Sequence, residues 1–274
     1  MTEVSKADFL ALTFDDLPTQ NNSKDPREEY LINKKILDTL KKHQEPAIGF
    51  VKESGLFFDD NFQERVKTFK LWVSYGFDLG NHSYSHFSLS KTDLEEYKQD
   101  VMKGEKISRP LMEEAHKKYK YFRHPYLDTG GSKEKRDEFE RFLKSRGYII
   151  APVTVDFNDW RFNAELLKNP EDKERVIKNY LSFASLVLEE SKQESIRIFG
   201  RNIKHIALLH VNLLNSLALD DLMSLIRSYN YDFVSLDDAM TDKVYREKDE
   251  YYEANGVSWL VRYNYTKNIE IIKP

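Results

Sequence analysis

The stretch that decides the fold lies near the N-terminus and reads Phe9-Leu10-Ala11-Leu12-Thr13-Phe14-Asp15-Asp16. A short apolar run of this kind is typical of a strand buried on both faces. An Asp-Asp pair by itself is more often a turn or a helix cap. Because the apolar run leads directly into this pair, we expect both carboxylates to stand at the end of a buried strand.

The same kind of run recurs along the chain, separated by amphipathic stretches. Further apolar runs span 47–51, 77–80, 119–122, 148–155, 205–210 and 232–236. Amphipathic stretches span 26–43, 61–75, 92–117, 132–146, 170–194 and 220–229. This alternation predicts βαβ units and a parallel sheet. We predict an α/β fold, a deformed (β/α) barrel of about seven parallel strands, because that many units in one chain favours a barrel over an open sheet.

Composition excludes several classes of protein. The 274 residues can form one large α/β barrel, and the formal net charge of −4 comes without a basic block, so no nucleic-acid partner is expected. No apolar run approaches the roughly 20 residues of a membrane span, so none is predicted. The absence of cysteine excludes disulfides, thiolate ligands and a cysteine nucleophile.

The first residues, Met1 to Asp8, are too short and too polar for a signal peptide. The sequence therefore belongs to a cytoplasmic protein or begins after a removed leader. In the second case a periplasmic or extracellular location is expected.

Polar side chains follow most of the predicted strands at the point where each strand ends. They are Asp15-Asp16, Asn81-His82, Arg123-His124, Asp156 and His210. In α/β barrels the carboxyl ends of the strands carry the active site. We therefore expect these groups to meet at one rim.

Two of these groups have the spacing of metal ligands. His82 and His86 are four residues apart, so one helical turn or a tight loop can direct both imidazoles at one ion. Asp15 or Asp16 would be the third ligand. Two histidines and one carboxylate leave positions open for water and substrate, as in a catalytic site. A hydrogen-bonded loop without a metal is the alternative interpretation of the two histidines.

Five segments, taken together, resemble a known family. They are Thr13–Asp16, His82–His86, Arg123–Tyr126, Asp156–Trp160 and Leu208–His210. In this order they are similar to the five motifs of the polysaccharide deacetylases, the NodB-homology carbohydrate esterases. The resemblance runs from about Phe9 to Ala239. It implies a NodB-like barrel over residues 1–240, a C-terminal extension over 241–274 packed on it, and one divalent metal ion, expected to be Zn²⁺.

The resemblance also implies an activity, the hydrolysis of N-acetyl groups on amino sugars of a chitin-like or peptidoglycan substrate, with metal-activated water. The metal ligands it implies are Asp16, His82 and His86. Asp15 would be the general base.

Further roles follow from the same resemblance. Arg123 would orient Asp15, and His210 would be the general acid, supported by Asp159 with Asp156 as second choice. The walls of the substrate pocket would come from Tyr126, which also offers its backbone N–H to the oxyanion, from Trp160 and from Leu208.

Two departures from the family pattern stand out. Leu17 replaces the glycine usual after the aspartate pair, and Leu127 replaces the glycine usual after Tyr126. Both are expected to alter loops at the mouth of the site and so to affect the choice of substrate.

Two alternatives to the deacetylase remain. A non-haem Fe(II) oxygenase also uses two histidines and one carboxylate, although its all-β fold does not match the alternation of strands and helices. The second alternative is a non-catalytic carbohydrate-binding barrel. The Tyr-rich segment from Tyr251 to Tyr265 is expected to pack on the barrel, with a substrate lip as the other interpretation.

Overall fold

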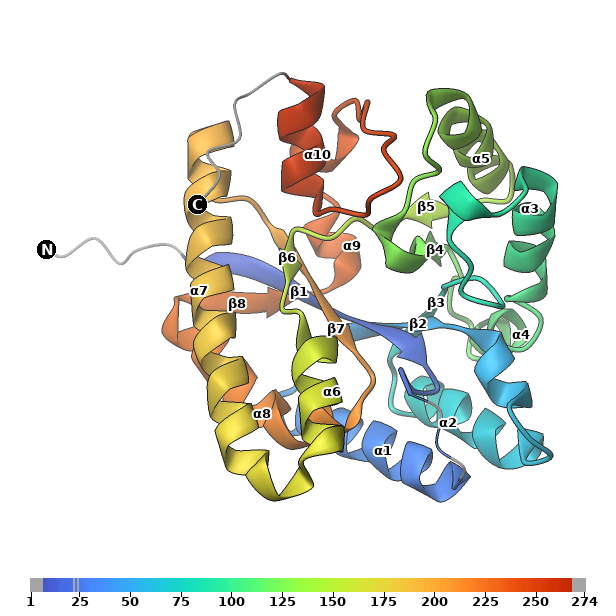
Figure 1. Cartoon of the computed structure of the whole chain (residues 1–274), viewed down its shortest axis with the longest axis vertical. Helices are drawn as coiled ribbons and strands as arrows, with labels where there is room; N and C mark the ends of the chain where they lie inside the picture. The colour runs from blue at the N-terminus through green and yellow to red at the C-terminus, as the bar shows by residue number, and fades with distance from the viewer. Residues whose placement is uncertain (1–6, 22, 24, 268–274) are drawn as a thin grey trace, which may run out of the picture.

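The computed structural model describes residues 7–21, 23 and 25–267. Eight strands within these residues form one sheet, and every pair of neighbouring strands is parallel (Figure 1). The strands are β1 (Asp8–Leu17), β2 (Ala47–Val51), β3 (Asp78–Asn81), β4 (Tyr121–Phe122), β5 (Ile149–Ile150), β6 (Val155–Asp156), β7 (His205–His210) and β8 (Tyr231–Val234). The predicted α/β barrel, deformed and curled into a half-barrel, is confirmed.

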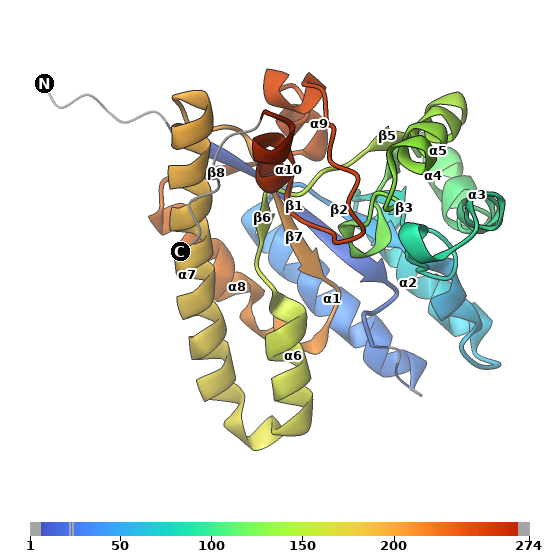
Figure 2. The ribbon, with the colours of Figure 1, turned by 45° about the horizontal axis from the view of Figure 1, so that its top comes forward.

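Ten α-helices connect and cover these strands in the described part of the chain (Figures 1 and 2). They are α1 (Pro26–His43), α2 (Phe62–Ser74), α3 (Leu94–Lys103), α4 (Ser108–Glu114), α5 (Lys133–Ser145), α6 (Asp159–Lys168), α7 (Lys173–Phe199), α8 (Leu213–Ser228), α9 (Leu236–Ala239) and α10 (Trp259–Thr266). No helix among the described residues has the length and apolar character needed to cross a membrane.

Strand β1 is the centre of the sheet. The strand order is β5-β4-β3-β2-β1-β7-β6, and β8 pairs with the first half of β1. The predicted run 148–155 forms two strands instead of one, β5 and β6, which are the two ends of this order. Pro152 lies between them, and because proline has no N–H it cannot continue a strand ladder.

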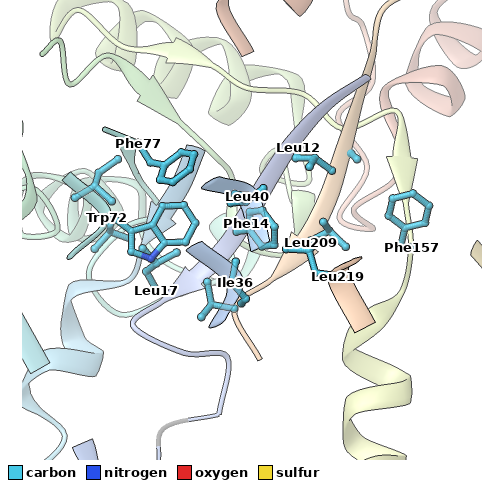
Figure 3. Packing of buried hydrophobic residues seen from close by; sticks show 14 of the residues in the cluster. Leu12, Phe14, Leu17, Ile36, Leu40, Trp72, Phe77, Phe157, Leu209 and Leu219 are labelled. Atoms are coloured by element: carbon cyan, nitrogen blue, oxygen red, sulfur yellow. The ribbon is translucent and has the colours of Figure 1, made fainter. Parts of the chain in front are cut away.

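The alternation of side chains along β1 separates two apolar clusters. Leu12 and Phe14 face the helices and pack with Trp72 of α2 and Leu40 of α1 (Figure 3). Ala11 faces the inside of the half-barrel, in a smaller cluster with residues of β2, β4 and β7. Successive residues of a strand point to opposite faces, so Thr13 and Asp15 continue the inward row.

Some helix boundaries differ from the sequence-based ones. The stretch 92–117 forms two helices, α3 and α4. Helix α3 ends at Lys103, and Gly104 is its C-cap. Helix α8 begins at Leu213, seven residues before the predicted start, because Asn212 caps it by accepting a hydrogen bond from the N–H of Asn215. Helix α6, which begins within the fourth motif at Asp159, was not predicted.

The C-terminal segment contacts both α7 and the strand region. Trp259 at the start of α10 stacks with Phe199 at the end of α7. The backbone N–H of Trp259 donates to the Val153 carbonyl at 2.6 Å. Helix α10 thus fixes the segment that leads to it. Residues 1–6 and 268–274 lie outside the described residues, and the division of the chain at residue 240 stays a prediction.

Candidate active site

The carboxyl ends of β1, β3, β4, β6 and β7 meet around one cavity of about 430 Å³. Its lining comes from all five sequence motifs and from three residues outside them, Gln20, Leu127 and Gly256. The lining residues are Asp15, Asp16, Gln20, His82, His86, His124, Tyr126, Leu127, Asp156, Asn158, Trp160, Leu208, His210 and Gly256. Arg123 and Asp159 are fully buried behind this lining.

The backbone explains how two neighbouring aspartates both reach the cavity. Asp15 belongs to the inward row of β1, so an extended Asp16 would point to the opposite face. Asp16 instead has a φ of 68°, in the left-handed region that aspartate tolerates better than most residues. This turn in the chain brings the second carboxylate to the same cavity.

The segment His82–His86 is a tight loop and not a helical turn. Ser83 and His86 both have positive φ values, 62° and 59°. The Asp100 carboxylate of α3 accepts hydrogen bonds from the N–H groups of Tyr84 and Ser85 at 3.1 and 3.0 Å. The Ser83 hydroxyl accepts the N–H of His86 at 3.0 Å. Hydrogen bonds therefore fix the loop that carries both imidazoles.

Asp16, His82 and His86 have the geometry of a metal site. One ligand atom from each lies within 4.8 Å of the others, and Asp16 Oδ1 is 3.3 Å from His86 Nε2 and 3.8 Å from His82 Nε2. His82 Nδ1 donates to the Arg123 carbonyl at 2.9 Å, which leaves Nε2 as the lone-pair nitrogen facing Asp16. Within the described part of the chain, Asp16 Oδ1 is buried without a hydrogen-bond partner. This donor set fits a divalent ion.

The protonation states of these three residues also suit metal binding. Burial lowers the pKa of His82 well below its usual value and lowers that of His86. Burial by itself would raise the pKa of Asp16, but Lys52, His86 and His210 outweigh it and lower that pKa to about 2. Neutral imidazoles and an ionised carboxylate are the forms that coordinate a metal.

Lys52 is a member of the site that the sequence interpretation missed. It follows β2 directly, and its Nζ lies 3.9 Å from Asp16 Oδ1. The side chain is only 15% exposed. The rule applied to the other strand ends would have found this residue, because Lys52 is the polar residue that ends the second apolar run.

Asp15 lies between Arg123 and the candidate metal ligands Asp16, His82 and His86, which we call the metal-binding triplet for the role proposed below. Arg123 Nη1 is 3.2 Å from Asp15 Oδ1, and its Nη2 donates to the Thr13 hydroxyl at 3.0 Å. The guanidinium also lies over the ring of Phe50. Burial has the largest effect on Asp15 and raises its pKa to about 6, against the attraction of Arg123. A carboxylate with a raised pKa is a better proton acceptor than an exposed one.

His210 faces the metal-binding triplet from β7, and Asp159 holds it from behind. His210 Nδ1 lies 2.7 Å from Asp159 Oδ1, so Nε2 is the nitrogen directed away from Asp159. Asp159 Oδ2 also accepts the His210 N–H and the amide of Asn212. Burial alone would lower the pKa of His210, but Asp159 outweighs it and raises that pKa to about 10.

The predicted pocket walls all reach the cavity. Tyr126 and Trp160 are 63% and 47% exposed, and Leu208 is buried. Asp156 lines the cavity too, with its Oδ1 accepting the N–H of Asn158 at 2.9 Å. The expectation for Leu17 was wrong. This side chain is fully buried against Gly49 and Trp72 in the core, and so it is not at the mouth of the site.

The chain belongs to the polysaccharide deacetylase family, and its deformed α/β barrel agrees with that assignment. The family model for polysaccharide deacetylase matches residues 3–148, just over half of the chain.

A curated relative is the peptidoglycan-N-acetylglucosamine deacetylase of Bacillus cereus, 29% identical over 152 residues, or 56% of this chain and 46% of the relative. The chain spans less than half of the length of the curated relatives it matches. Among solved structures, the chitin deacetylase of Colletotrichum lindemuthianum has a TM-score of 0.59 at 18% identity, covering 86% of this chain and 88% of the other. A CE4-family pseudoenzyme of Bacillus anthracis, in a mutant form with restored activity, has a TM-score of 0.57 at 21% identity, covering 86% and 68%.

Proposed function

We propose that the protein is a metal-dependent hydrolase that removes the N-acetyl group from N-acetylglucosamine residues of a glycan, chitin-like or peptidoglycan. The observation that carries this proposal is the meeting of a proton acceptor, a proton donor and a metal-binding triplet at one cavity. Family membership and the names of the relatives support the choice of substrate class.

Asp16, His82 and His86 would hold the ion, with Zn²⁺ as the proposed metal. When bound, such an ion makes water a stronger nucleophile and polarises the amide carbonyl.

Asp15 is the proposed general base, which takes a proton from the attacking water as its oxygen adds to the acetamide carbon. Arg123 is a positioning residue that fixes the orientation of Asp15 through the 3.2 Å contact. The Tyr126 backbone N–H is the proposed donor to the oxyanion that forms on the carbonyl oxygen, a contribution that is large in a dry site.

His210 is the proposed general acid. When the C–N bond breaks, Nε2 of His210 gives its proton to the departing amine, so that free amine and acetate are the products. Asp159 holds His210 in the protonated form that this step requires. Trp160 and Leu208 are proposed to enclose the acetyl group and exclude bulk water.

The test is acetate release from N-acetylglucosamine oligomers and from peptidoglycan, with the Zn²⁺-loaded protein and with Asp15→Asn as the matched control. We expect acetate from the wild type and a loss of about 10² to 10⁴-fold in the variant, the usual cost of removing a general base. Glycan binding without any acetate release would instead support the non-catalytic barrel. The parallel α/β sheet does not fit the all-β fold of the oxygenase alternative.

A further inference from the structure

The loop that carries the proposed oxyanion donor has an unusual backbone. Tyr126 and Leu127 both lie in the left-handed region, with φ values of 58° and 54°. Two consecutive residues with a Cβ rarely adopt this conformation, since the Cβ of each crowds the backbone. Such a conformation persists only where the surrounding structure holds it.

A segment distant in sequence contacts this loop. We call residues 247–258, which connect the turn after α9 to α10, the C-terminal strap. Its Gly256 lies so close to the loop that an added Cβ would stand 1.7 Å from the Tyr126 carbonyl oxygen and 2.9 Å from the Leu127 carbonyl carbon. Figure 2 shows the strap, in red, passing beside the green chain that follows β4. Gly256 also lines the cavity.

The strap is anchored on both sides of Gly256. The Tyr251 carbonyl accepts hydrogen bonds from Arg136 Nη1 of α5 at 3.0 Å and from the Thr129 hydroxyl at 3.4 Å. On the other side, the Trp259 N–H donates to the Val153 carbonyl. Between these anchors, the Tyr251 hydroxyl donates to the Asn255 carbonyl at 2.6 Å. The backbone at Gly256 is therefore held against the loop from two directions.

We propose that the C-terminal strap is part of the active site and that Gly256 is a positioning residue for Tyr126. By bearing on the Tyr126 carbonyl, Gly256 holds the Tyr126–Leu127 peptide in place. It thereby fixes the φ of Tyr126, which sets the angle between that peptide and the preceding Pro125–Tyr126 peptide, the one that carries the Tyr126 N–H. The inference rests on the proposed function, because that function gives the N–H its role. A side chain at position 256 would push the peptide away and misdirect the donor.

The same displacement would reach a second group. The Tyr126 ring packs edge-on against the His86 ring, with ring centroids 4.5 Å apart. A small shift of the loop leaves His86 in place, because Asp100 and Ser83 hold the His82–His86 loop independently. The strap is therefore expected to affect catalysis and not metal binding.

The experiment compares Gly256→Ala with Asn255→Ala, an exposed neighbour on the strap, and with Gly104→Ala. Gly104 bears in the same way on the other loop, where an added Cβ would stand 2.5 Å from the Ser83 carbonyl carbon. For Gly256→Ala we expect kcat to fall by about 10 to 10²-fold, since misdirecting one oxyanion donor costs up to what removing it costs. KM and the Kd for Zn²⁺, measured by calorimetry, should stay within about twofold, while Gly104→Ala weakens Zn²⁺ binding.

Leu127→Gly supplies the rescue. Glycine adopts left-handed and other conformations freely. In the double variant the Tyr126–Leu127 peptide can therefore yield to the new methyl group without turning the Pro125–Tyr126 peptide, which carries the N–H. Partial recovery of kcat in Leu127→Gly/Gly256→Ala supports the proposal. A kcat for Gly256→Ala equal to that of Asn255→Ala would overturn it, and so would a parallel loss of Zn²⁺ affinity.

A crystal structure of Gly256→Ala separates this inference from the proposed function. A displaced Tyr126–Leu127 peptide together with a turned Tyr126 N–H supports the positioning role even if the wild type releases no acetate, a result that would refute the proposed function alone. An unmoved peptide would refute the positioning role whatever the activity.

Discussion

Histidines on opposite walls of the cavity are all largely buried, yet their pKa values shift in opposite directions. On one wall, burial lowers the pKa of His82 and of His86, and the Nδ1 of His82 donates to a backbone carbonyl. On the other wall, the Nδ1 of His210 meets the Asp159 carboxylate, which raises the pKa of His210 to about 10. A neutral carbonyl leaves burial as the dominant effect, whereas a carboxylate reverses it.

The partner behind each ring therefore selects its chemistry. The neutral imidazoles have lone pairs for a metal, and the imidazolium has a proton to give. The sequence motif alone contains only the residue type. The predictions below each remove one element of this contrast.

The largest effect is expected on the wall of the cavity that carries His82 and His86. His82→Ala removes one of three protein ligands, so Zn²⁺ affinity should fall by more than about 10²-fold and acetate release should reach background. Elemental analysis of the purified variant measures the loss, with His43→Gln on α1 as the control. Full zinc occupancy in His82→Ala would contradict the ligand assignment.

The next largest effect is expected at Asp15, the carboxylate that lies between these two walls. Asp15→Asn should keep its Zn²⁺ and lose about 10² to 10⁴-fold in kcat, because the proton acceptor is lost and the ligands are not. Calorimetry of zinc binding and acetate release measure the two properties separately. If the variant lost its zinc instead, Asp15 and Asp16 would exchange roles.

A smaller effect is expected at Asp159, the partner of His210 on the opposite wall. Asp159→Asn removes the group that raises the pKa of His210, so burial dominates and the basic limb of the kcat/KM profile should move to lower pH by more than about one unit. Asp156→Asn is the matched control. A limb that stays in place in Asp159→Asn and moves in Asp156→Asn would transfer the supporting role to Asp156.

The same pair also predicts a pH-dependent stability. The folded-state pKa of His210, about 10, lies above its ordinary 6.5. The protonated His210 therefore adds its full contribution to the free energy of unfolding below pH 6.5. This contribution is lost as the pH rises through 10. The difference in stability between wild type and Asp159→Asn, measured by urea unfolding, should shrink across that window. A constant difference would show that the pair is not the source.

The smallest effect concerns Lys52, whose ammonium lies beside the metal-binding triplet. A cation 3.9 Å from Asp16 Oδ1 competes with a divalent ion for the same oxygen and repels it. Lys52→Met should therefore tighten Zn²⁺ binding by about tenfold, which corresponds to roughly 1.4 kcal/mol. Calorimetry with Lys67→Met on α2 as the control measures it. Weaker binding in Lys52→Met would contradict this repulsion.

Local pattern predicted the fold and most of the site. Each predicted strand ends at or directly before a polar residue, and parallel strands end at the same edge of a sheet. This pattern was enough to predict that Asp16, His82, Arg123 and His210 lie at one rim. The position of Pro152 could have indicated the division of the run 148–155. The residues that surround these groups were harder to foresee.

Contacts between segments that are distant in the sequence could not be predicted, because no local pattern indicates them. Asn212, which donates to Asp159 across 53 positions, looks like any helix cap. Gly256 is one glycine in a polar segment, and only the approach of Tyr126 gives it meaning. Leu17 was expected at the mouth because of a family comparison, whereas the pairing of β1 with β2 extends to Leu17 and buries it in the core.

The register between β1 and β7 has a consequence for how the protein loses activity on heating. Asp15 and His210 are the last pair of this ladder, so the proposed base and acid are spaced by the pairing of β1, the central strand, with β7. Amide hydrogens in the interior of a buried ladder like this one exchange with solvent chiefly through global unfolding. Local opening of the loops can therefore interrupt turnover only reversibly, and permanent inactivation should follow the same temperature dependence as exchange of the β1 and β7 amides.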